Sequence, residues 1–143
     1  MAAITGTMNH FSRNKVMDFV LGSAGVGAAS ASSFIGLWLS AIDASASGQQ
    51  AGEVNAGSYK RASANNDLNT WSTAVSGEKH NLIAINFPTA TANFGNVSCF
   101  GICDNITAGN MLWWGYLNTP GAVNSGSAVQ IASGQLVLRM SAV

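Results

Sequence analysis

The sequence predicts an all-β body with one short helix in front of it. From residue 34 on, apolar runs with strand-like alternation are separated by turn residues about every ten positions, which is the spacing of a β-sandwich or barrel. Before residue 34, one helical stretch is followed by a run of Gly, Ala and Ser. We therefore expect two parts, an N-terminal helix with an Ala/Ser/Gly-rich arm in residues 1–33 and a β-sandwich domain in residues 34–143.

The N-terminal helix is expected over residues 10–21. Asn9 can cap its first turn, Gly22 supplies a stop signal, and Phe19 falls on its apolar side. A helix of this length is too short to be stable alone in water, so it must pack on this domain or on a neighbour. Phe19 is therefore a candidate interface residue. The small-residue stretch 22–33 is expected to be a flexible tether that lets the helix reach an adjacent subunit, and the sandwich is expected to fold without this arm.

The body is expected to contain a series of short strands. In chain order they are 34–40, 58–64, 81–87, 97–103, 111–117, 128–132 and 135–141. Pro88 ends the third of them, since proline cannot donate to a strand ladder. Ser133-Gly134 is a tight-turn signal, which predicts that the last two strands form a hairpin.

The charge content is low, with only six basic and six acidic side chains in 143 residues. This is about a third of the usual charged fraction, and a solvated monomer surface normally needs more. The zero net charge argues against a nucleic-acid partner, because phosphates are met by Lys and Arg clusters. The weakly apolar Gly/Ala/Ser stretch argues against a membrane span. The chain is therefore expected to be covered by other protein, as a homo-oligomer with a dimer favoured.

The sequence holds no pattern that indicates catalysis. No Gly-x-Ser-x-Gly elbow surrounds a serine, and His80 lies in a polar run that predicts a solvated turn. Cys99 and Cys103 are four residues apart, about 13 Å along a strand, which is too far for a disulfide, and neither histidine has zinc-ligand spacing to them. We expect two reduced cysteines, no catalytic residue, no metal site and no cofactor, and so no enzyme.

Two groups of residues are candidate contacts to a partner. Trp113 and Trp114 are consecutive, so one indole should enter the core and the other should face outward or into a second layer, beside Tyr116. An interface role is favoured over sugar stacking for these rings. Tyr59 and Arg61 share a strand face, and Arg61 can either make a polar contact to a partner or hold a local ion pair.

A series of Phe-Gly and turn motifs resembles a family of small virion proteins of tailed phages, often labelled tail-fibre-like, some of which are similar to capsid cement (decoration) proteins. The motifs run in order through residues 34–140: Ser58-Tyr59-x-Arg61, Phe87-Pro88-Thr89-Ala90-Thr91, Phe94-Gly95-x-Val97, Phe100-Gly101-Ile102-x-Asp104, Gly109-Asn110-x-Leu112, Val123-Asn124-Ser125-Gly126 and Ala132-Ser133-Gly134-x-Leu136.

The resemblance implies a jelly-roll-like β-sandwich and a structural role in a virus particle. The leading expectation is a capsid cement protein that binds the major capsid protein, stabilises the shell and lies on the capsid surface after assembly in the host cytoplasm. The first alternative is a tail or tail-fibre component that binds a host surface. The second alternative is a lectin-like carbohydrate-binding domain.

Overall fold

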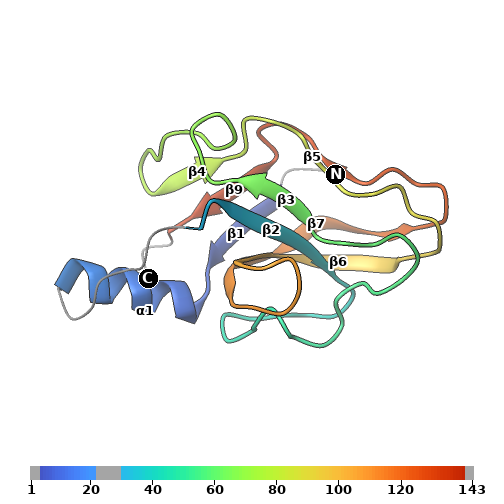
Figure 1. Cartoon of the computed structure of the whole chain (residues 1–143), viewed down its shortest axis with the longest axis horizontal. Helices are drawn as coiled ribbons and strands as arrows, with labels where there is room; N and C mark the ends of the chain where they lie inside the picture. The colour runs from blue at the N-terminus through green and yellow to red at the C-terminus, as the bar shows by residue number, and fades with distance from the viewer. Residues whose placement is uncertain (1–3, 22–29, 141–143) are drawn as a thin grey trace.

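A curled seven-stranded sheet forms the body of the protein in the computed structural model, which describes residues 4–21 and 30–140 (Figure 1). The strand order is β3-β2-β6-β7-β1-β9-β4, and β5 and β8 pair in a separate two-stranded sheet. The elements are β1 (Ile4–Met8), α1 (His10–Leu21), β2 (Ser32–Trp38), β3 (Ala62–Asn65), β4 (Glu78–His80), β5 (Ile85–Asn86), β6 (Gly95–Cys103), β7 (Met111–Val123), β8 (Gln130–Ile131) and β9 (Leu136–Arg139). The prediction of an all-β fold with a short N-terminal helix is confirmed.

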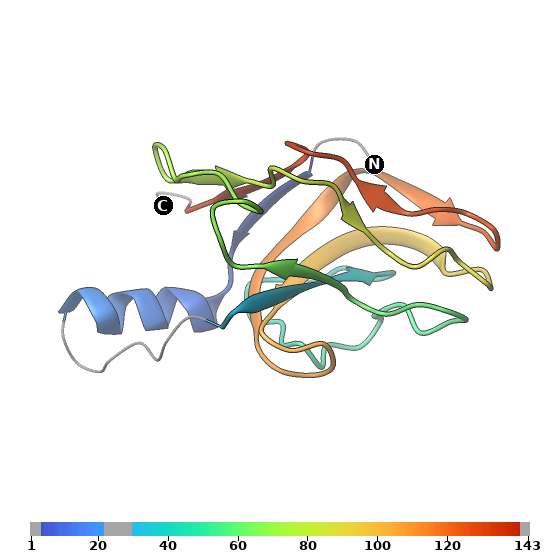
Figure 2. The ribbon, with the colours of Figure 1, turned by 45° about the horizontal axis from the view of Figure 1, so that its top comes forward.

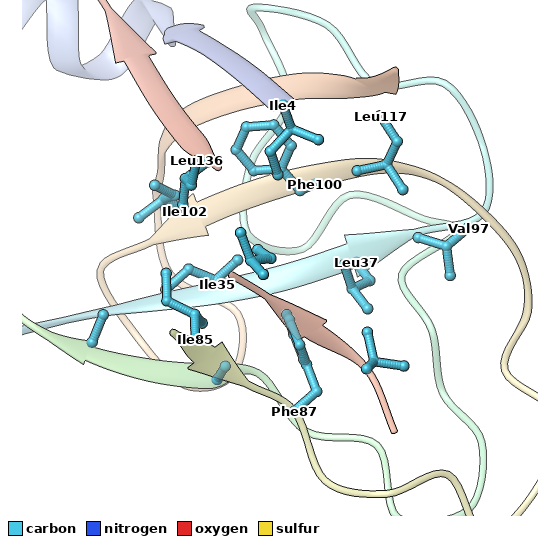
Figure 3. Close-up of a cluster of buried hydrophobic side chains, with 14 of the residues drawn as sticks. Ile4, Ile35, Leu37, Ile85, Phe87, Val97, Phe100, Ile102, Leu117 and Leu136 are labelled. Atoms are coloured by element: carbon cyan, nitrogen blue, oxygen red, sulfur yellow. The ribbon is translucent and has the colours of Figure 1, made fainter. Parts of the chain in front are cut away.

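The main core lies on the inner face of the curled sheet. Strand alternation sends Ile35 and Leu37 of β2, and Phe100 and Ile102 of β6, to this face. There they meet side chains from the other strands, and the labelled residues of Figure 3 converge from several directions. β6 is an interior strand, and most of its residues are buried because a second apolar layer covers its outer face.

That second layer is a smaller core between the sheet and the loop that follows β2. Its members are Trp38, Ile42, Ala46, Cys99, Cys103 and Met111, with Trp114 packed against them. The indole N–H of Trp38 donates to the carbonyl of Gln50 at 3.0 Å, which ties the loop to the strand it left. Both cysteines are free and buried here, so the expected reduced state is confirmed.

The helix prediction is confirmed to the residue. Asn9 caps α1, because its Oδ1 accepts the Phe11 N–H at 3.0 Å and its carbonyl accepts the Arg13 N–H at 3.0 Å. The expected tether lies largely outside the described residues, which resume at Ser30. Within the described ranges, no helix is both long and apolar enough to cross a bilayer.

The expected boundary at residue 33 does not separate the sheet from the N-terminal segment. β1 lies inside the sheet, antiparallel to β7 and parallel to β9, and Ile4 is buried in the main core. A chain that starts after α1 would lose this interior strand and leave two neighbours unpaired. The expectation that the sandwich folds without its N-terminal segment is therefore corrected.

Two local predictions in the body are also corrected. Ser133-Gly134 forms a turn, with Gly134 at φ 76°, but β8 pairs with β5 whereas β9 pairs with β1 and β4, so the turn carries the chain between sheets. The polar run expected to be a turn is a turn only at Ser76-Gly77, after which β4 pairs with β9.

Four expected strands are shorter in the structure. The run 58–64 is a strand only from Ala62 on, and the run 81–87 is a strand only at Ile85–Asn86. Within the described residues, the runs 128–132 and 135–141 are strands only at Gln130–Ile131 and Leu136–Arg139. In the run 81–87 the buried side chain of Asn81 takes the place of ladder bonds, because it donates to the carbonyls of Ile83 and Ala132 and accepts the Leu136 N–H. This side-chain network joins the chain before β5 to the start of β9.

Candidate interaction site

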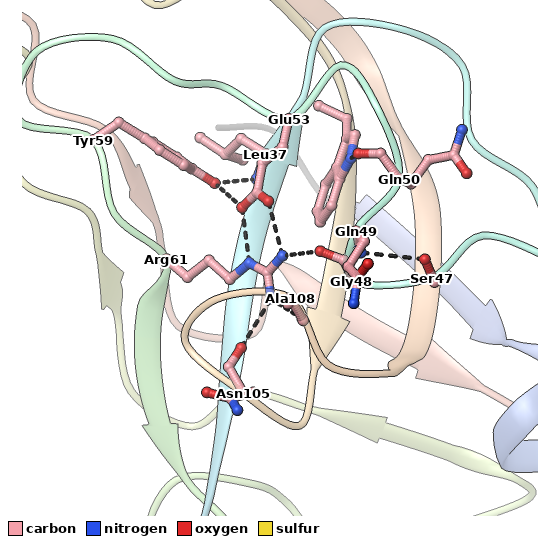
Figure 4. Close-up of polar contacts among 11 residues, drawn as sticks. Leu37, Ser47, Gly48, Gln49, Gln50, Glu53, Tyr59, Arg61, Asn105 and Ala108 are labelled. Atoms are coloured by element: carbon pink, nitrogen blue, oxygen red, sulfur yellow. Dashed lines mark hydrogen bonds and ion pairs between the residues drawn. The ribbon is translucent and has the colours of Figure 1, made fainter.

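Arg61 lies immediately before β3 and is buried, with 3% of the residue exposed. Its Nε and one Nη donate to the two carboxylate oxygens of Glu53, each at 2.8 Å. The remaining N–H groups donate to the carbonyls of Gly48, Asn105 and Ala108 (Figure 4). Arginine carries five N–H donors, and all five are used within the chain.

Glu53 and Tyr59 complete this network. Oε1 of Glu53 also accepts the Tyr59 hydroxyl at 2.9 Å, and that hydroxyl in turn accepts the Leu37 N–H at 2.9 Å. Burial holds the pKa of Tyr59 far above its usual value, and the neighbouring Glu53 carboxylate adds to this effect. The phenol therefore stays neutral. The guanidinium lies over the Trp38 ring, 5.6 Å from its centroid. The network joins β2 to the loops 39–61 and 104–110.

The structure therefore gives Arg61 an internal role. Of the two readings of this residue, the local ion pair is the one observed, and the guanidinium has no donor left for a partner. Burial opposes the charge, but the hydrogen bond to Glu53 and the electrostatic effects of Cys103, Glu53 and Tyr59 together outweigh it, so the pKa of Arg61 is raised. The contact that a sequence cannot show is the pairing of one arginine with three carbonyls from two distant loops.

Trp113 and Trp114 point to opposite faces of β7, as strand alternation predicts. Trp113 packs against the main core and Trp114 against the second core, so the second ring faces a second layer rather than solvent. Both rings are partly buried. The indole N–H of Trp114 is buried with no hydrogen-bond partner among the described residues. Neither ring is a free aromatic platform.

Tyr116 is the exposed member of the aromatic group, with 51% of its surface open to solvent. Its hydroxyl donates to the carbonyl of Ile42 at 3.1 Å, and its ring stands edge-on to Trp114 at 5.7 Å. The side chain therefore covers the second core and is held in place on both sides.

Helix α1 carries three exposed large apolar side chains among the described residues. Phe11, Met17 and Leu21 are 37%, 59% and 77% exposed. In Figures 1 and 2 the helix points away from the sheet, and only its first turn lies against the body. Phe19 lies on this helix, but its side chain is outside the described residues.

An apolar groove opens at the end of the sandwich from which α1 leaves, and the sequence did not predict it. Its volume is about 410 Å³, and it lies between the ends of β3 and β9, the start of β2 and the β4 turn. Its apolar lining includes Leu68, Trp71, Ile102, Trp113, Leu138 and Met140. Leu68 and Met140 are exposed at its edge. The available signal for this groove in the sequence was Leu68, an apolar residue among the Asn and Asp residues of positions 65–69.

The described residues hold no cluster of three or more His, Cys, Asp or Glu side chains that could bind a metal ion. The buried Cys103 thiol is a poor nucleophile, because burial raises its pKa to about 12. The chemistry of these surfaces is therefore that of apolar contact and fixed hydrogen bonds.

Comparison with known proteins places this architecture in a phage family. No curated protein matches the chain. A family model described as podophage GP4 fiber I protein gp80 matches residues 7–139. The match covers nearly the whole chain, and it confirms the resemblance to structural proteins of tailed-phage virions. The chain thus belongs to the podophage GP4 fiber I protein gp80 family and is a structural protein of the phage virion.

Proposed function

We propose that this chain is a subunit of a phage fibre, where it has a structural role and no catalytic one, and where it associates with further copies of itself. The family description, which names a fiber protein, supports a place in a fibre. The buried thiols and the internally saturated Arg61 support a structural role, because these reactive or charged groups are turned inward.

The observation that carries the proposal is the unpartnered helix α1. A 12-residue helix gains little stability from its own hydrogen bonds, and most helical stability in proteins comes from packing of an apolar face. Here Met17 and Leu21 are left in solvent, although the first turn is firmly capped. A surface of this kind is typical of an assembly contact.

The expected capsid cement role, with the major capsid protein as partner, stays a prediction. A place in a fibre agrees better with the family description. The lectin-like alternative has less support, because Trp113 and Trp114 each pack against a core and Tyr116 is fixed to the loop that it covers.

Imaging of intact particles tests the proposal. An epitope inserted at the Gly126 turn reports position, because this turn faces open space. Gold-labelled antibody is expected on the fibres of tagged particles, with untagged particles as the control. Label spread over the capsid facets would overturn the fibre proposal and favour the cement role.

A further inference from the structure

We propose that the apolar groove at the end of the sandwich receives helix α1 of a second copy of this chain, so that two copies exchange helices. The inference rests on the proposed self-association and names its contact surfaces. The groove is defined by the lining given above, and its floor is made of Trp71, Ile102 and Leu138, all buried members of the main core. Leu68 and Met140 extend the apolar surface to the edge.

The exposed side of α1 suits a groove of this kind. Met17 and Leu21 are four residues apart, so they lie one turn apart on the same helix face. Side chains at this spacing are the usual anchors when an amphipathic helix binds in an apolar groove. The groove volume of about 410 Å³ is within the range of sites that enclose a few side chains.

The helix of the same chain is held away from this groove. Its first residues are fixed beside the second core: the Asn9 amide donates to the carbonyl of Ala46 at 2.8 Å, and the His10 N–H donates to the carbonyl of Ala44 at 2.9 Å. The groove instead opens on the face of β7 that carries Trp113. The start of α1 and the groove therefore lie on opposite faces of β7. Moving α1 into the groove of its own chain would break the cap at Asn9.

A second copy meets both surfaces without this conflict. Helix and groove lie at the same end of the molecule, so a two-fold axis there can place each helix over the groove of its partner. One charge pair also fits this arrangement. Asp67 lines the groove, with a carboxyl pKa held low by hydrogen bonds from Thr70 and Asn69, and α1 carries the exposed Lys15. Lys79 lines the groove as well, so the contact depends mainly on apolar side chains. Polar atoms elsewhere in the groove are few, which favours an apolar occupant.

Sedimentation of the full chain at micromolar concentration tests the exchange. We expect a dimer. Replacing the helix anchors, Met17→Ser with Leu21→Ser, should weaken dimerisation at least about tenfold, and so should Leu68→Asp at the groove edge. These side chains are exposed, so the variants should keep the wild-type circular dichroism and urea midpoint. Ile83→Ser is the matched control, because Ile83 is exposed but belongs to neither surface.

A mixing experiment tests the reciprocity. The helix variant supplies an intact groove and the Leu68 variant supplies an intact helix, so an equimolar mixture should form a heterodimer although each variant alone is monomeric. A monomeric wild-type chain, a dimer unaffected by both variants, or a mixture without heterodimer would overturn the inference. Fibre labelling with a monomeric chain would leave the place in a fibre standing but would overturn the self-association and the helix exchange. Labelling of the capsid, together with a dimer that both variants dissociate, would overturn the place in a fibre and leave the helix exchange standing.

Discussion

At the scale of single residues, Arg61 shows how a charge can serve the fold. Its side chain is 1% exposed and makes a bidentate pair with Glu53, whose side chain is 23% exposed. Arg61→Ala removes five hydrogen bonds and leaves the Glu53 carboxylate without its counter-charge. We expect a loss of about 3–5 kcal/mol in the free energy of unfolding, measured by urea denaturation, because breaking a buried pair exposes the remaining group to its full desolvation cost.

Arg139→Ala is the control for this prediction. Arg139 pairs with Glu78 at the surface, and both side chains are about half exposed. Its removal should cost no more than about 1 kcal/mol. A similar, small loss for both arginines would show that the Arg61 network contributes little to stability.

The two tryptophans should respond alike to truncation. Trp113→Ala opens the main core and Trp114→Ala opens the second, and each ring is partly buried. We expect each substitution to lower the free energy of unfolding by about 2–5 kcal/mol in urea titrations. Tyr116→Ala should cost less, because half of that side chain is in solvent. If only one of the two substitutions lowered the free energy of unfolding, the other ring would not contribute to the packing of its core.

The buried thiol predicts a decline of stability at high pH. Burial raises the pKa of Cys103 to about 12, against an ordinary value near 9.0. Between these two pH values the Cys103 thiol keeps its proton in the folded state and loses it in the unfolded state. The stabilisation is complete below pH 9 and is lost progressively as the pH rises toward about 12. We expect the urea midpoint of the wild-type chain to fall more between pH 8 and 10.5 than that of Cys103→Ala. Equal slopes would contradict the prediction.

At the scale of elements, local signals were sufficient for α1 and insufficient for β1. A cap at Asn9 and a stop at Gly22 are adjacent to the helix, so the sequence alone locates it. β1 has only five residues, including Gly6 and two threonines, and is stabilised by strands more than 100 residues away in sequence. The same holds for the pairing of β8 with β5 and for the Arg61 network, whose partners come from separate loops. These features depend on tertiary contacts that no local pattern contains.

Two glycines of β7 test the place of β1 in the sheet. A Cβ on Gly115 would come within 2.3 Å of the Thr5 carbonyl oxygen and 2.7 Å of the Phe100 ring, whereas a Cβ on Gly121 meets nothing within 4 Å. Gly115→Ala should therefore lower the free energy of unfolding by about 1–3 kcal/mol, and Gly121→Ala should change it by no more than about 0.5 kcal/mol. Thermal or urea unfolding measures both. A tolerated Gly115→Ala would mean that β1 does not lie against β7.

At the scale of the whole molecule, the low charge content and the two apolar layers belong together. Cores on both faces of the sheet bury most of the interior strand β6. Of the few charges, the Arg61–Glu53 pair is used inside. What remains for a partner is apolar surface on α1 and in the groove. Composition alone indicated that the chain is covered by protein, but it could not locate the covered surface, which is assembled from distant segments.

The proposed self-association should therefore depend little on salt. Apolar contacts are not screened by ions, and a single exposed pair such as Lys15 with Asp67 contributes at most about 1 kcal/mol. We expect the dimer dissociation constant, measured by sedimentation equilibrium, to change less than about threefold between roughly 0.05 M and 0.5 M sodium chloride. Because burial of apolar surface lowers the heat capacity, calorimetric dilution at several temperatures should also give a negative heat-capacity change on association. A tenfold weakening in high salt would instead identify an interface dominated by charge, and it would contradict the apolar contact proposed between α1 and the groove.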